Sequence, residues 1–283
     1  MKIKLIADST CDIPDDLIAQ LDIRIAPLSI SMGDKIYKDG KEVTSSDIFN
    51  FTDTGKGICR TSAVNIAEYS DIYAQERPNC DAILHFIISK DMSACYQNAQ
   101  LAAQDYDNIF IIDTRNLSSA MGLLILDATD LISEGRTPEE IYNEITRRIP
   151  LQDAGFIIDT LQYLHKGGRC TSIQALASSV LKIKPSITVK DGHMSVGKKY
   201  RGNLENILRK YIQDRLHNKQ NIDTRRIFIA NTMTTQNQAL VAQAKSIINE
   251  IMQFDQVYET PAGGTISCHC GPNTLGIFFS RKT

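Results

Sequence analysis

The hydrophobic positions in the first half of the chain follow an alternation of strands and helices. Ala82–Ile88 is an almost unbroken apolar run of strand length, which is typical of a strand covered on both faces. Ile66, Tyr69, Ile72 and Tyr73 recur at the spacing of one helix face. Further strands are expected at Ile3–Ala7, Ile23–Ile30 and Ile109–Ile112, and further helices at Pro14–Leu21, Ser93–Asp105, Ser118–Ser133 and Thr137–Pro150. Repeated strand–helix–strand units predict a mostly parallel sheet flanked by helices, with Pro27 favouring an edge or a bend.

The second half of the chain has a different pattern. Asp191-Gly192 is typical of a tight hairpin turn, so the strands on either side of it are expected to pair antiparallel. Leu151-Gln152-Asp153 is interpreted as a linker. The remaining elements expected are strands at Lys184–Val189, His193–Lys199, Ile227–Ala230 and Thr274–Phe279, and helices at Leu204–Leu216 and Gln236–Met252. We therefore predict two α/β domains: residues 1–152 with a mostly parallel sheet, and residues 153–283 with a mixed or antiparallel sheet and helices.

Composition and charge narrow the class of protein. Of the 283 residues, 42% are hydrophobic and 23% are charged, as in an ordinary globular protein, and the net charge of −2 gives no pull toward nucleic acid or anionic membrane. No window approaches the ~18 apolar residues of a membrane-spanning helix. The apolar start is too short for a signal sequence, and seven cysteines without disulfide-framework spacing favour a reducing compartment. These features predict a cytoplasmic protein without stable membrane insertion.

Five short polar motifs are spread along the chain, and most of them stand where predicted strands end or helices begin. They contain hydroxyls and glycines but few charges, which suits one polar head group better than a metal ion or a polyphosphate. Capping of a helix is the structural alternative for each serine or threonine. The motifs are Asp8-Ser9-Thr10, Arg60-Thr61-Ser62, Ser93 with Tyr96, Gly167-Gly168-Arg169 and Cys268-His269-Cys270-Gly271-Pro272.

Several common chemistries lack their sequence signals. The chain has no phosphate-binding loop and no dinucleotide fingerprint, so a site for ATP is unsupported. Cys268-His269-Cys270 would place its side chains on alternating faces of an extended segment, and no second pair with zinc spacing accompanies it. We therefore expect no metal and no cofactor, and interpret His269 as a hydrogen-bond donor. A nucleophile elbow is also absent.

At these residues the chain resembles the DegV family of bacterial fatty-acid-binding proteins. The resemblance covers essentially the whole length and depends on the order and spacing of the motifs. Besides the motifs above, it includes Asp113, Met121-Gly122, Leu164-His165-Lys166, Leu181-Lys182-Ile183-Lys184-Pro185, Asp191-Gly192, Arg201-Gly202 and Asn273-Thr274-Leu275-Gly276. The chain departs from the family at two places. Ala63-Val64-Asn65 follows the Thr61-Ser62 motif, and Ala94-Cys95 follows Ser93.

The resemblance implies a tunnel for a long-chain fatty acid between or within two α/β domains. The carboxylate would be held by Thr61 and Ser93, with Ser62 in the same motif and His269 close to the head group. Arg201 would contact the head group or a partner protein. Relatives present the acid to a separate ATP-dependent fatty-acid kinase, which makes an acyl phosphate for phospholipid synthesis. The implied protein is a carrier that performs no chemistry alone.

Two other classes of function remain open at this stage. A histidine and a hydroxyl also occur in enzymes, so His269 as a phosphoryl carrier or Ser93 as the nucleophile of a hydrolase are the alternatives. A general protein-interaction module is the third, because a carrier must also dock its kinase.

Overall fold

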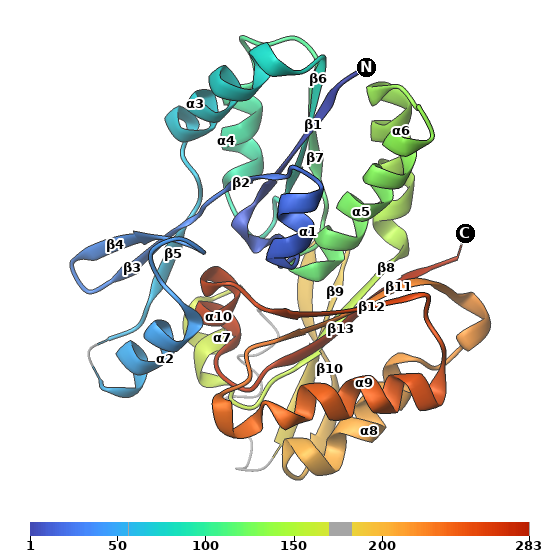
Figure 1. The fold of residues 1–283 in the computed structure, drawn as a ribbon. Coiled ribbons are helices and arrows are strands. Elements are labelled where there is room, and N and C mark those ends of the chain that lie inside the picture. The colour runs from blue at the N-terminus through green and yellow to red at the C-terminus, as the bar shows by residue number, and fades with distance from the viewer. Residues whose placement is uncertain (56, 170–182, 283) are drawn as a thin grey trace.

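The computed structural model describes residues 1–55, 57–169 and 183–282, and Leu181 and Lys182 of the family motif lie outside these ranges. Three sheets and their covering helices make up the described chain (Figure 1). No helix in these ranges is long and apolar enough to cross a membrane.

The N-terminal sheet is parallel throughout and has the order β2-β1-β6-β7. Alternate side chains of its central strand β6 (Ala82–Ile87) enter two different cores, with Ile83 on one face and Leu84 on the other. This arrangement confirms the prediction of a strand covered on both faces. The other strands are β1 (Ile3–Asp8), β2 (Arg24–Ala26) and β7 (Ile109–Asp113), and the helices are α1 (Asp15–Gln20), α3 (Ile66–Glu76), α4 (Cys95–Ala102), α5 (Ser119–Ser133) and α6 (Pro138–Arg148).

A small antiparallel sheet, β4-β3-β5, projects from the parallel sheet (Figure 1). The single extended run expected at Ile23–Ile30 is divided at Pro27, because β2 joins the parallel sheet whereas β3 (Ser29–Met32) joins the small one. The prediction of a bend is therefore confirmed. The elements that sequence reasoning left unassigned here are β4 (Lys35–Lys38), α2 (Ser45–Asp53) and β5 (Arg60–Ser62).

The C-terminal sheet is mixed and has the order β10-β9-β8-β13-β11-β12. All neighbours pair antiparallel except β11 and β12, and the β9–β10 hairpin turns at Asp191-Gly192 as predicted. The α/β class with a parallel and a mixed sheet is thus confirmed. The strands are β8 (Gln152–Ile157), β9 (Ile183–Lys190), β10 (His193–Arg201), β11 (Ile222–Asn231), β12 (Gln256–Pro261) and β13 (Leu275–Arg281), and the helices are α7 (Gln162–Gly167), α8 (Leu204–Arg215), α9 (Ala239–Ile251) and α10 (Gly264–Cys270).

Two sequence-based expectations are wrong in this half. Leu151-Gln152-Asp153 is no linker, because Leu151 ends a helical turn and Gln152 begins β8. Cys268-His269-Cys270 is helical rather than extended, since it forms the last turn of α10. The division into residues 1–152 and 153–283 itself stays a prediction.

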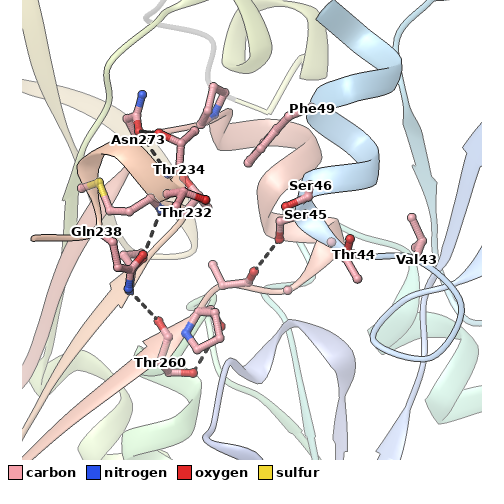
Figure 2. A pocket seen from close by; sticks show the side chains of 18 of the residues that line it. Val43, Thr44, Ser45, Ser46, Phe49, Thr232, Thr234, Gln238, Thr260 and Asn273 are labelled. Carbon is pink, nitrogen blue, oxygen red and sulfur yellow. Dashed lines mark hydrogen bonds between the residues drawn. The ribbon is translucent and has the colours of Figure 1, made fainter.

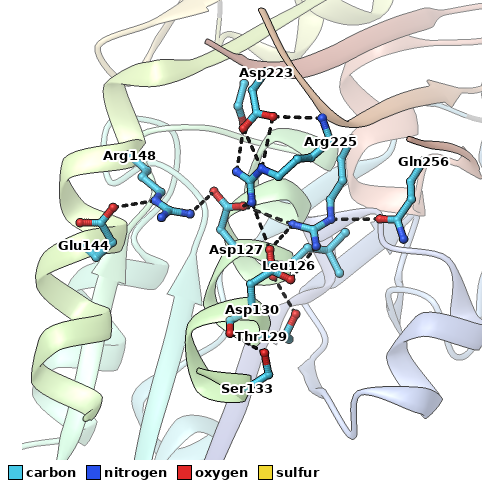
Figure 3. Close-up of polar contacts among 12 residues, drawn as sticks. Leu126, Asp127, Thr129, Asp130, Ser133, Glu144, Arg148, Asp223, Arg225 and Gln256 are labelled. Atoms are coloured by element: carbon cyan, nitrogen blue, oxygen red, sulfur yellow. Dashed lines mark hydrogen bonds and ion pairs between the residues drawn. The ribbon is translucent and has the colours of Figure 1, made fainter. Parts of the chain in front are cut away.

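A hydrophobic core shared by the two larger sheets holds the mixed sheet against the N-terminal half, and ion pairs add to it. Arg226 of β11 places Nη2 2.6 Å from Asp130 Oδ1 of α5, and Arg225 places Nη1 3.1 Å from the buried Asp127 (Figure 3). Asp127 also pairs with Arg148 of α6 at 3.1 Å. Because these charges form a connected network, they fix α5 against β11 more firmly than isolated surface pairs would.

The short helix α10 is anchored at its start by two buried carboxylates. The N–H of Gly263 donates to Asp12 Oδ1 at 2.8 Å. Those of Gly264 and Thr265 donate to the two oxygens of Asp39 at 2.8 and 3.2 Å. A carboxylate at a helix N-terminus satisfies N–H groups that have no partner within the helix. The two aspartates therefore fix the position of α10 relative to the parallel sheet.

We expect the β9–β10 turn to depend on glycine at position 192. Gly192 has φ +86°, and a Cβ there would lie 2.7 Å from Asp91 Oδ2 and 2.8 Å from Ser89 Oγ. Gly192→Ala should lower the free energy of unfolding by about 2–4 kcal/mol, as the sum of backbone strain and a clash. Chemical denaturation measures this loss. Gly135→Ala is the matched control, because Gly135 has φ +77° but open space, and an equal loss in both variants would contradict the clash.

We expect the anchor of α10 to make stability depend on pH. Burial raises the pKa of Asp12 from 3.8 to about 7, so the folded protein binds more protons than the unfolded chain between these values. Protonation of Asp12 therefore contributes to the stability of the folded protein. This contribution is complete below pH 3.8 and is lost as pH rises through about 7. From about pH 8 to about pH 6 the wild type should therefore gain stability relative to Asp12→Asn, by at most about 1.4 kcal/mol per pH unit.

Urea unfolding of both proteins at several pH values tests this expectation, and pH profiles that run parallel would contradict it. The comparison uses the difference between the proteins because burial lowers the pKa of His85 to about 3 and that of His269 to about 4. As pH falls, the unfolded chain binds protons at these histidines before the folded protein does. They therefore lower the stability of both proteins toward acidic pH.

Candidate functional site

The candidate site lies at the carboxyl ends of the parallel strands. From the adjacent strands β1 and β6 the sheet extends in opposite directions, to β2 and to β7. Such a switch in strand order opens a crevice where ligands of α/β proteins bind. The segments that follow β2, β6 and β7 meet β5, β10 and α10 at this crevice.

A cavity of about 190 Å³ occupies the crevice. It brings together four of the five residues predicted for the site, namely Thr61, Ser62, Ser93 and His269. Arg201 is exposed at the end of β10 and does not line this cavity. The other lining residues are Leu28, Ala63, Ile88, Met92, Ala94, Leu117, Arg169, Met194, Thr265, Ile266 and Cys270.

Thr61 and His269 form the closest polar pair in the cavity. Thr61 Oγ1 lies 2.8 Å from His269 Nε2, and Nδ1 has no partner among the described residues. Burial, followed by the positive charge of Arg169, lowers the pKa of His269 to about 4, so the imidazole is neutral near pH 7. With its proton on Nε2, the ring donates to Thr61 and leaves the threonine O–H free to donate to a ligand.

The glycine motif makes room for the histidine. A Cβ at Gly167 would lie 2.3 Å from His269 Nδ1, so the imidazole occupies the space that any side chain at 167 would need. Arg169, two residues later, is exposed and also lines the cavity. The Gly-Gly-Arg segment thus combines a close approach of backbone to ring with a nearby cation.

Helix capping, the structural alternative for the predicted hydroxyls, applies to Ser93 but not to Thr61 and Ser62. Helix α3 is capped by Asn65, whose Oδ1 accepts the N–H of Glu68 at 2.9 Å, so Thr61 and Ser62 lie on β5 and cap nothing. Ser93 Oγ does accept the N–H of Cys95 at 3.3 Å, and it donates to the thiol of the same residue. A thiol is a weak acceptor, so the Ser93 O–H remains able to donate to a carboxylate.

The first polar motif proves to be a support of the site. Ser9 Oγ donates to Asp39 Oδ2 at 2.8 Å and accepts the N–H of Leu28 at 3.1 Å. Asp39 in turn anchors α10, and Ser9 is not among the residues that line the cavity. Sequence reasoning missed both Asp39 and Thr265, and no motif in the sequence marks either residue as part of the site.

Cys268 has a thiol as its partner. Both cysteines are free, and the hydrogen bond between the thiols of Cys268 and Cys59 lowers the pKa of the Cys59 thiol. Across the described ranges, no group of three or more histidine, cysteine or acidic side chains is placed to hold a metal ion. Cys268 and Cys270 are both buried, and each packs in one of the hydrophobic cores.

A larger cleft of about 1260 Å³ lies between α2, the end of β11 and the start of α9 (Figure 2). Hydroxyl and amide side chains line it, and several bond within the protein: Thr234 donates to Asn273 Oδ1 at 3.0 Å, and Ser45 donates to the carbonyl of Ala262 at 3.0 Å. Its polar wall does not suit a long apolar chain. The smaller cavity combines hydroxyls with an apolar wall and is therefore the better site for an amphiphile.

Comparisons with known proteins identify the family of this chain. The sequence matches the model of the DegV family, described as an uncharacterised protein family, over residues 2–282. A DegV domain-containing protein of Caldanaerobacter subterraneus subsp. tengcongensis is 29% identical over 283 residues and is covered to 99%, as is this chain.

Solved structures with the same fold include fatty-acid-binding proteins. A fatty-acid-binding DegV family protein from Thermus thermophilus is 27% identical, with a TM-score of 0.89 over 99% of this chain and 100% of that one. DegV of Bacillus subtilis, also a fatty-acid-binding protein, is 26% identical, with a TM-score of 0.82 over all of both chains. The chain therefore belongs to the DegV family.

Proposed function

We propose that this protein binds a long-chain fatty acid, with its carboxylate held by Thr61 and Ser93 beside His269, and presents the acid to a separate ATP-dependent fatty-acid kinase. One observation carries the proposal: the cavity is lined both by neutral hydrogen-bond donors and by aliphatic side chains. The fatty-acid binding of the two related DegV structures supports the same class of ligand.

The polar end of the cavity suits a carboxylate. Hydroxyls of Thr61, Ser62 and Ser93 offer neutral donors, and the neutral His269 adds no full charge. A buried anion needs such hydrogen bonds, because an unpaired charge in an apolar site is strongly disfavoured. Arg169 supplies the cation that lines the cavity and lies in a position exposed to solvent.

The apolar end leads toward the core between the two larger sheets. Leu117, Ile266 and Cys270 line both this cavity and a narrow apolar space beyond it, which reaches Phe156 and Phe278 of the mixed sheet. Pockets for ligands of this size usually measure roughly 300–1,000 Å³, so an acyl chain must widen the passage. The flexible side chains of Met92 and Met194 in its wall suit such repacking.

Burial of the tail provides most of the affinity. About fifteen methylenes at roughly 0.8 kcal/mol each contribute on the order of 12 kcal/mol, from which association and ordering remove several. The hydroxyls then need only fix the position of the carboxylate. This division agrees with a site that holds its head group loosely enough to hand it on.

Delivery to a kinase fits the exposed side of the cavity. Ser62 and Arg169 are both exposed, which leaves the head-group end open to a partner protein. Arg201 is exposed as well, and we assign it to contact with that partner. The chain has no ATP-binding motif, so the phosphoryl donor would be bound by the partner.

No geometric observation favours the enzymatic alternatives. His269 bonds to Thr61, whereas Ser93 forms its hydrogen bonds with Cys95, so the described residues do not form the Ser93–His269 pair that a hydrolase requires. His269 Nδ1 lies against Gly167, which leaves little room for a phosphoryl group on that nitrogen. The carrier function is therefore the better supported proposal.

We expect the purified protein to carry a fatty acid. Organic extraction of protein that has never been delipidated, followed by mass spectrometry, should yield close to one C14–C18 acid per chain, because the buried tail is released slowly. The same extraction after incubation with a fatty-acid mixture serves as the second arm. Absence of acid in both arms would contradict the proposed function.

We expect the double variant Thr61→Ala with Ser93→Ala to bind palmitate at least about tenfold more weakly, because two donors to a charged acceptor are lost. Titration calorimetry with delipidated protein measures the change, and circular dichroism checks the fold. Thr188→Ala with Ser195→Ala is the matched control, since it removes another threonine–serine pair, 3.1 Å apart on the β9–β10 hairpin. Equal affinities in the two double variants would remove Thr61 and Ser93 from the site.

A further inference from the structure

Thr265 differs from the other buried threonines of the described chain. It is 4% exposed, and its Oγ1 has no hydrogen-bond partner among the residues that the structure describes. The remaining buried threonines all place Oγ1 within hydrogen-bond distance of a protein acceptor: Thr10 at Asp8, Thr114 at Ile87, Thr232 at Gly271, Thr260 at Pro261 and Thr274 at Cys270. A buried hydroxyl without a partner is uncommon in folded proteins and needs a physical reason.

The place of Thr265 in the fold points to a ligand. It lines the same cavity as Thr61 and Ser93. It also precedes His269 by four residues, so the two side chains lie on one face of α10, one turn apart. Its backbone N–H is already used in the bond to Asp39, so the hydroxyl is not needed to anchor the helix. The unpaired hydroxyl therefore belongs to the cavity and not to the anchor.

We propose that the hydroxyl of Thr265 is a further donor to the carboxylate of the bound acid. This inference rests on the proposed function, because it assigns a residue to the same head-group site. The hydroxyl lacks its bond in the free protein and gains it when the acid binds. The fold thus holds the donor in a less stable state that the ligand completes.

This assignment gives Thr265→Val two effects of opposite sign. Valine has nearly the shape of threonine without the polar group, so it removes an unsatisfied buried hydroxyl and should raise the melting temperature of the free protein. The same change removes a donor to a charged acceptor and should weaken palmitate binding about tenfold. A threonine whose hydroxyl served the fold would lower the melting temperature when replaced.

The experiment uses four proteins of full length, all delipidated: wild type, Thr265→Val, Thr265→Ser and Thr114→Val. Melting temperature without ligand and affinity for palmitate are measured for each. Thr265→Ser keeps a hydroxyl and should retain binding close to wild type. Thr114→Val is the control, because its Oγ1 donates to the carbonyl of Ile87 at 2.8 Å and it does not line the cavity. It should lower the melting temperature and leave affinity unchanged.

The expected result is higher thermal stability together with weaker binding in Thr265→Val alone. A lower melting temperature, or failure to fold, would show that the hydroxyl has a partner within the protein and would overturn the inference. If the wild type binds palmitate and Thr265→Val binds it equally well, the inference is also overturned, while the proposed function remains intact. A wild type that binds no acid would overturn both, and this arm separates the two failures.

Discussion

The site depends on the anchoring of α10 by Asp12 and Asp39. A helix of seven residues is too short to be stable by itself, so its position must come from contacts outside it. The two carboxylates bind its first N–H groups and belong to the segments after β1 and β4. Through this anchor the C-terminal half of the chain places His269 beside Thr61. Without it, the polar end of the cavity would lose one of its walls.

The anchor carries an electrostatic cost that the fold accepts. Burial raises the pKa of Asp12 to about 7, and the negative charges of Asp39 and Asp8 contribute to this rise. Replacing such groups by apolar residues often stabilises a protein, yet here they satisfy backbone donors at a helix start. The carboxylates are retained for the geometry they impose. Positional accuracy at the head-group site is thus gained at the expense of stability.

Local sequence patterns account for the large elements of the fold. The unbroken apolar run at Ala82–Ile88 predicts β6, and Asp191-Gly192 predicts the β9–β10 hairpin, because each depends on residues near one another. The small sheet could not be found in this way, since β4 has no buried residue and its pairing comes from tertiary contacts. Helix α10 was missed for the same reason, as its capping carboxylates lie 225 and 251 residues earlier in the chain.

The candidate site was predictable to a similar degree and for similar reasons. Thr61, Ser62, Ser93 and His269 carry the family resemblance, and the fold brings them to one cavity. Arg201 belongs to the same motif series but lies outside the cavity, because the strand β10 ends away from it. Thr265 has no motif to mark it. Only its burial without a partner distinguishes it, and that property exists only once the chain has folded.

In the proposed function, binding of the carboxylate and folding are coupled through α10. The cavity walls come from β5, the loop after β6, α10 and β10. A carboxylate that bonds to Thr61, Ser93 and a donor on α10 would connect these segments. It would then stabilise the position of α10 in addition to the two aspartates. Binding to the folded state alone stabilises it in proportion to ligand occupancy. Under the proposed function, the protein with bound acid is therefore more stable than the free protein.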